Sequence, residues 1–148
     1  MSLFESISSD MKSAMKSGER ARVDVLRFVL AGLQGVQKEK NVKEPGVALT
    51  DAETIAILQK EAKRRKEAIE LFKQGKREDL VTKESADLVI IQSYLPKELS
   101  EEEIGKVIDG LREQGFADFN MLMRESMKVL KGKADGKIVG EVIKKKIS

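Results

Sequence analysis

The residues best suited to chemistry in this chain are lysines gathered around one short segment near the C-terminus. The segment Met127–Lys137 reads MKVLKGKADGK, a basic helix end followed by a glycine stop and a new helix start. Lysines in this arrangement bind the phosphates of an anionic polymer through charge alone. The predicted nucleic-acid contacts are Lys128, Lys131, Lys133, Lys137 and Lys144. The alternative is a solvated corner whose lysines offset the negative end of a helix dipole.

Two further charged residues, Arg65 and Glu84, occupy positions on the apolar stripes of two expected helices. Charges at the edge of a core usually pair, with their stems covering apolar surface, so we expect an ion pair between these helices. The alternative is a polar pocket in which Arg27, Arg65 and Glu84 converge on a small ligand. An enzymatic function would require that pocket.

Composition excludes several classes of chemistry. The chain has no cysteine and no histidine, which removes disulfides, thiolate metal sites and catalysis that depends on either side chain. Neither a phosphate-loop lysine motif nor a dinucleotide glycine fingerprint is present. Carboxylates such as those of Glu101–Glu103 fall in expected first turns of helices, where negative charge is stabilising. We therefore expect no catalytic residue, no cofactor and no metal.

The balance of charge along the chain says more than its total. The formal net charge of +3 is too small to argue for nucleic acid. Residues 101–123 contain two basic and six acidic residues, whereas residues 124–148 contain eight basic and three acidic ones. Such asymmetry orients an anionic partner toward the C-terminal end.

The apolar pattern predicts helices throughout. With 41% hydrophobic and 36% charged residues, few aromatics and two prolines, the composition suits amphipathic helices. We expect four helices in residues 1–95, the first ended by Gly18, the third opened by a Thr50–Glu53 capping box and closed by Gly75, and the fourth running from Arg77 to Tyr94. Short connections favour antiparallel neighbours, so this part is predicted to be a helical bundle.

A second unit is predicted to begin at Pro96, because the residue before a proline disfavours helix. Ser100 and Glu103 then supply a new capping box, and three short apolar stripes follow. Each stripe has too few anchors to be stable alone, so residues 96–148 are expected to form a small three-helix domain. The predicted fold class is all-α.

The location is predicted to be cytoplasmic. No apolar run approaches the length of a membrane span. Glu5 and Asp10 interrupt the stretch where an export signal would need apolar residues, so export and a membrane partner are not expected.

Several segments in order resemble one family. They are Leu26-Arg27, Lys63–Ala68 (KRRKEA), Tyr94–Pro96 followed by Leu99–Ile104 (LSEEEI), Met127-Lys128 and Lys131–Gly136 (KGKADG). Together they cover essentially the whole chain, which resembles the YqeY-like proteins. The C-terminal part is similar to the tail domain of the B subunit of tRNA-dependent amidotransferases.

This resemblance implies an all-α protein whose tail-like domain contacts the outer body of tRNA, or a tRNA-amidation complex. It also implies a label of carbon–nitrogen ligase with glutamine as amido-nitrogen donor. That label belongs to the larger subunit, whose ATP-dependent catalytic domain this chain lacks, so we expect no catalysis by the chain alone. Arg124 stands where the family usually has a glycine, which predicts an altered contact there.

The sequence thus favours a tRNA-associated binding protein. The second hypothesis is a protein–protein adaptor with no RNA contact, which would dock through an exposed apolar groove between bundle helices.

Overall fold

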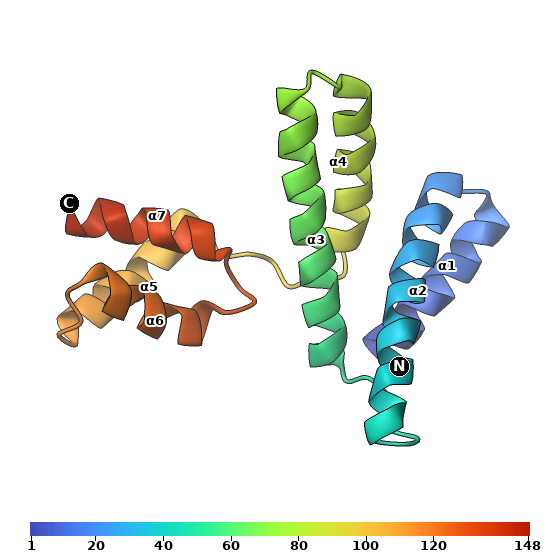
Figure 1. The fold of residues 1–148 in the computed structure, drawn as a ribbon, viewed down its shortest axis with the longest axis horizontal. Coiled ribbons are helices and arrows are strands. Elements are labelled where there is room, and N and C mark those ends of the chain that lie inside the picture. Colours follow the sequence, from blue (N-terminus) through green and yellow to red (C-terminus); the bar gives the residue numbers. More distant parts are fainter. The chain divides into compact units, whose positions relative to one another are not determined.

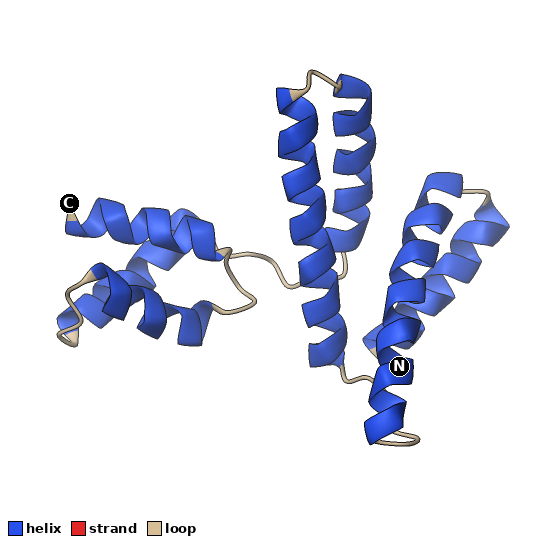
Figure 2. Cartoon of the chain, in the orientation of Figure 1, coloured by secondary structure: helices blue, strands red, loops and turns tan.

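The computed structural model describes all of residues 1–148 and contains seven α-helices and no strand (Figures 1 and 2). The prediction of an all-α fold is therefore confirmed. The chain divides into two compact units, Met1–Leu95 and Pro96–Ser148. The helices are α1 (Leu3–Ser17), α2 (Arg20–Lys43), α3 (Asp51–Gln74), α4 (Glu78–Gln92), α5 (Glu101–Glu113), α6 (Phe119–Leu130) and α7 (Gly136–Ile147).

The N-terminal unit consists of two helical hairpins, α1 with α2 and α3 with α4 (Figure 1). Gly18 ends α1 with a φ of 76°, a left-handed conformation that glycine adopts without steric cost. The buried residues of the shared core come from all four helices and the α2–α3 loop; they are Ile7, Val25, Leu26, Val29, Leu30, Leu33, Leu49, Leu58, Ala62 and Ile91.

Local signals set the ends of α3. The Thr50 hydroxyl accepts from the backbone N–H of Glu53, and the Glu53 carboxylate accepts from the backbone N–H of Thr50, so the predicted capping box is present. Lys40 of α2 also donates to Glu53 at 2.6 Å. The hydrogen bond from Lys40, followed by that from the Thr50 backbone, lowers the pKa of Glu53 to about 2. At the other end Gly75 is the C-cap, but it is Lys76 that takes the left-handed conformation, with a φ of 55°.

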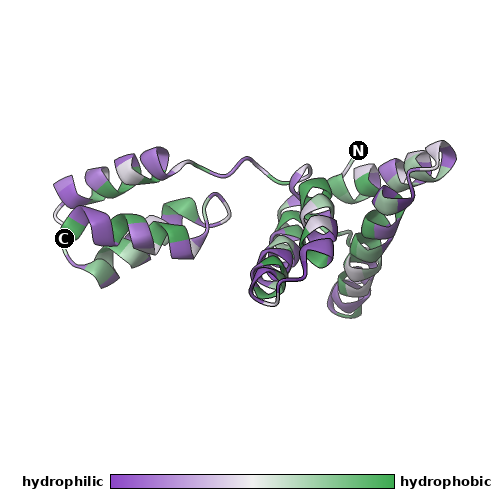
Figure 3. Cartoon of the chain, turned by 90° about the horizontal axis from the view of Figure 1, so that it is seen from above, coloured by the Kyte–Doolittle hydropathy of each residue, from purple (hydrophilic) through white to green (hydrophobic).

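The C-terminal unit packs α5, α6 and α7 around its own core of seven buried apolar residues, namely Ile104, Ile108, Leu122, Leu130, Val139, Val142 and Ile143. Figure 3 shows hydrophilic and hydrophobic residues alternating along these helices, the amphipathic pattern from which such a core is built. Ser100, Asp118 and Asp135 cap the three helices through their side-chain oxygens. The backbone N–H of Leu99 donates to the carbonyl of Lys133, which ties the segment before α5 to the α6–α7 loop.

No helix combines the length and the hydropathy needed to cross a membrane.

Candidate nucleic-acid interface

The α6–α7 loop is held rigidly by backbone and capping contacts. Helix α6 ends at the fully buried Leu130, whose carbonyl accepts from the N–H of Lys133 at 2.8 Å. Gly132 has a φ of 81°, so the chain turns there, and the Asp135 carboxylate accepts from the N–H of Lys137 at 2.9 Å to start α7. The backbone of this loop is thus fixed, while its lysine side chains extend into solvent.

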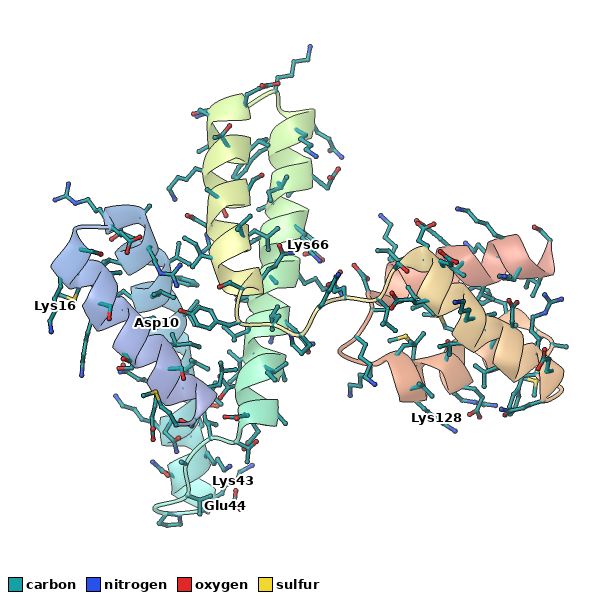
Figure 4. The ribbon with its side chains drawn as sticks, turned by 180° about the vertical axis from the view of Figure 1, so that it is seen from behind. Asp10, Lys16, Lys43, Glu44, Lys66 and Lys128 are labelled. Atoms are coloured by element: carbon teal, nitrogen blue, oxygen red, sulfur yellow. The ribbon has the colours of Figure 1, made fainter.

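All five predicted contact lysines are exposed. Lys131, Lys133 and Lys137 make no ion pair, so their charges are available to a partner. Lys128 Nζ lies 3.1 Å from Glu125 Oε1, an exposed pair that is easily exchanged for a phosphate. Figure 4 shows Lys128 directed away from the three-helix core.

Lys144 is the outlying member of the set. It follows Lys137 by seven residues, which places it two turns, or about 10 Å, further along α7. Its ammonium lies 5.9 Å from the centre of the Phe119 ring, within reach of a cation–π interaction. The surface is therefore a strip that starts at the loop and continues along α7. We call the exposed lysines Lys128, Lys131, Lys133, Lys137 and Lys144 the lysine strip.

The structure separates Lys145 and Lys146 from this strip, although the sequence presents Lys144–Lys146 as one basic run. Lys146 Nζ lies 3.0 Å from Asp109 Oδ2, and Lys145 Nζ lies 3.8 Å from Glu101 Oε2. Both partners belong to α5, so the acidic face of that helix neutralises the end of α7. The sequence reveals these partners only as charges 44 and 37 residues away.

Arg124 lies on α6 and is exposed. It adds a further positive charge to the helix that carries Lys128, at the position where the resemblance predicts a glycine.

In the N-terminal unit, the ion pair expected between Arg65 and Glu84 is present at 3.0 Å. Arg65 also binds Asp87 at 3.0 Å and Glu61 at 3.1 Å. Sequence reasoning missed these two carboxylates, although Glu61 lies four residues before Arg65 and Asp87 three residues after Glu84, one helical turn away in each case. The three carboxylates satisfy the guanidinium, so the arrangement reads as a structural network.

Aromatic cover completes that network, and Arg27 lies outside it. The centre of the Phe28 ring is 5.4 Å from Cζ of Arg65. Arg27 is exposed and instead lines a surface hollow of about 330 Å³ at the α1–α2 turn, together with Arg20 and Asp24. The three residues of the hypothetical polar pocket therefore do not converge.

A second buried contact, also missed from the sequence, joins the end of α4 to the first hairpin. The Tyr94 hydroxyl donates to Asp10 Oδ2 at 2.6 Å and accepts from Arg22 Nη2 at 3.3 Å. Burial, followed by the hydrogen bond to Asp10, raises the pKa of Tyr94 to about 12. Tyr94 is the residue next to the last one of the N-terminal unit, so this contact fixes where the bundle ends.

Comparison with known proteins gives consistent relatives. A mitochondrial protein of Pyrenophora tritici-repentis, "Altered inheritance of mitochondria protein 41", is 31% identical over 148 residues, which span 95% of this chain and 76% of that protein. One subunit of the glutamyl-tRNA(Gln) amidotransferase of Thermococcus sibiricus is 32% identical over 128 residues, 83% of this chain but 20% of that subunit. The corresponding subunit of Methanocaldococcus jannaschii is 39% identical over 59 residues, 34% of this chain and 9% of that subunit.

The chain is thus similar to a small segment of the amidotransferase subunits and to most of the mitochondrial protein. The Yqey-like protein family matches it over residues 4–147, nearly its whole length. With this match, the chain belongs to the Yqey-like protein family.

Proposed function

We propose that this protein is a tRNA-associated binding protein that contacts RNA phosphates through the lysine strip. The observation that carries the proposal is the state of Lys131, Lys133 and Lys137, which are exposed, unpaired and fixed on one rigid loop. Positive side chains that are already free of carboxylates bind a phosphate without first breaking an ion pair. Binding of this kind reads the backbone and shape of folded RNA, and not its base sequence.

The relatives support tRNA as the anionic partner. Two of them are subunits of an amidotransferase whose name contains its tRNA substrate, glutamyl-tRNA(Gln). The segment of similarity is a small part of those subunits, so it supports a binding role in association with tRNA or with a tRNA-amidation complex. A cytoplasmic location stays a prediction, because the name of the Pyrenophora relative places that protein in mitochondria.

The test is binding of the purified protein to unmodified tRNA across a salt series. Wild type is compared with the Lys131→Ala/Lys133→Ala double variant and with Lys145→Ala/Lys146→Ala as the matched control. Both doubles remove the same charge from the same unit, but Lys145 and Lys146 are already paired with α5. If each lysine of the strip displaces one counterion, the first double variant lowers the slope of log K against log salt by about 1.8 for duplex RNA, at roughly 0.9 for each contact.

The control variant is expected to keep a slope close to that of wild type. Equal loss in the two variants would show that net charge alone, without this loop, governs binding. Failure of wild type to bind tRNA even at low salt would overturn the proposal and leave a binding protein that engages another protein.

A further inference from the structure

Helix α2 has an outward face that no other part of its own unit covers. The face is made by residues at alternating spacings of four and three, and every one of them is exposed: Asp24, Phe28, Ala31, Gly35, Lys38 and Val42. We call these residues the outer face of α2. The opposite side of the helix holds the buried Leu26, Leu30 and Leu33. Alternating spacings of this kind form the contact seam when two helices pack along their length.

Two glycines on this side of α2 have no purpose within the chain itself. A Cβ atom added to Gly32 or Gly35 would meet no other atom within 4 Å. Each glycine nevertheless destabilises the interior of a helix by about 1 kcal/mol relative to alanine. Glycines in such positions allow another helix to approach closely, and no helix of this unit does so.

The outer face also exposes large apolar side chains. Phe28 is 55% exposed and Val42 is 83% exposed, although both lie on a helix whose other side builds the core. One side of the Phe28 ring covers Arg65, and the remaining surface faces outward.

We propose that the outer face of α2 packs antiparallel against the same face of a second copy of this chain. A two-fold axis beside Ala31 brings Phe28 over Gly35 of the second copy, so a large side chain fills the space that a glycine leaves. The same axis places Asp24 opposite Lys38 of the second copy, and the reciprocal pair forms at the other end. These matches follow from the numbering, since 28 and 35 lie on either side of 31 and 32, as 24 and 38 do of 31.

The pattern of charge and size selects this occupant and this orientation. A parallel pair would set Asp24 against Asp24, Lys38 against Lys38 and Phe28 against Phe28, which combines repulsion with crowding. The antiparallel pair converts each of these conflicts into a match, and isologous packing is the commonest symmetry of soluble dimers. Because α2 carries none of the residues of the lysine strip, this inference is independent of tRNA binding.

The first experiment introduces one cysteine at a time into the full chain, which has none of its own. Ala31→Cys places the thiol beside the axis, within reach of its counterpart, whereas Val42→Cys places the two thiols about 31 Å apart along the paired helices. Oxidation is expected to yield a covalent dimer for Ala31→Cys and none for Val42→Cys. Equal or greater cross-linking at the more exposed Val42 position would overturn the proposal, because it would show random collision or another register.

The second experiment measures mass by sedimentation over a range of concentrations. Wild type is expected to shift from monomer to dimer as concentration rises, while Asp24→Lys and Lys38→Asp each remain monomeric. The double variant that exchanges both charges is expected to regain the dimer. Gly35→Gln is expected to stay monomeric and yet unfold at a temperature no lower than wild-type monomer, since glutamine favours helix more than glycine. A wild type that is monomeric throughout, or a charge exchange that fails to restore the dimer, would overturn the proposal.

Discussion

At the scale of single residues, the network around Arg65 shows how one cation organises two helices. The Arg65 side chain is 13% exposed and that of Asp87 is 9% exposed, so both charges have lost most of their hydration. Burial of this kind is tolerated only where partners and hydrogen bonds compensate the lost water. Here Glu61, Glu84 and Asp87 supply them from α3 and α4.

Removing the cation is therefore expected to cost more than removing a surface charge. Arg65→Met would leave three carboxylates close together without a partner, and we expect a loss of about 3 kcal/mol in the free energy of unfolding. Urea unfolding followed by circular dichroism measures this loss. Arg64→Met, on the exposed side of the same helix, is the control and should change stability by less than about 0.5 kcal/mol. Similar losses in the two variants would contradict a structural role for the network.

Tyr94 offers a second prediction at this scale, because it is the one tyrosine of the chain. Its pKa is raised to about 12 from the ordinary value of 10.0, so the folded state favours the protonated phenol. The stability that this provides is fully present below pH 10.0 and is lost as the pH rises toward about 12. Tyr94→Phe removes the hydrogen bonds to Asp10 and Arg22, and we expect it to destabilise the protein by about 1 kcal/mol at neutral pH.

The phenolate absorbance of wild type measures this titration directly, since the chain has no tryptophan. The folded protein should titrate near pH 12 and the urea-unfolded protein near 10.0. The difference in stability between wild type and Tyr94→Phe should shrink across the same interval. Titration of the folded protein near 10.0 would show that the contact with Asp10 does not form.

At the scale of elements, the head of α3 is held by its own cap and by α2. Thr50→Ala removes the acceptor for the N–H of Glu53, and we expect a loss of about 1 kcal/mol in unfolding free energy. Chemical denaturation at neutral pH measures it. Thr82→Ala is a useful control, because the Thr82 hydroxyl bonds to a carbonyl of its own helix and caps nothing. If both variants lose the same stability, the cap contributes nothing special.

Acid should weaken the same element through Glu53. Its pKa is lowered from 4.5 to about 2, so the stabilisation is present above pH 4.5 and is lost as the pH falls toward about 2. Glu53→Gln is therefore expected to be less stable than wild type at neutral pH, with the difference narrowing through that acid interval. Unfolding curves at several pH values give the comparison. A difference that does not change with pH would rule out the lowered pKa as its cause.

At the scale of the whole molecule, each unit has its own core, and the lysine strip belongs entirely to the second one. We predict that residues 96–148 alone form helices and bind tRNA with the same salt dependence as the full chain. Their stability should be low, since 53 residues bury a limited core. Circular dichroism and a tRNA salt series on this fragment check both points. A fragment that folds but does not bind would show that the N-terminal unit contributes contacts.

Much of this architecture could be predicted locally. The stops and starts at Gly18, Thr50, Ser100 and Asp135 depend on residues within one turn, so they are readable from the sequence. The left-handed Lys76 was not predicted, because its neighbour Gly75 carries the stronger signal for that conformation.

The candidate site divides along the same line. The exposure of Lys131 and Lys133 follows from their place between two capped helices, and the similarity to the Yqey-like family follows from motifs that are contiguous in the chain. The neutralisation of Lys146 by Asp109 does not follow, because 37 residues separate them and only the packing of α7 on α5 brings them together.

The sequence by itself therefore determined the all-helical class, the positions of the caps, the family and the concentration of positive charge near the C-terminus. These properties depend on periodicity and composition within single helices. Only the tertiary structure decided which lysines remain free, that Arg65 serves three carboxylates while Arg27 stands apart, and that the outer face of α2 is uncovered. The reason is physical: a charge or an apolar surface acquires its role from what lies across the helix interface, and that neighbour is distant in the chain.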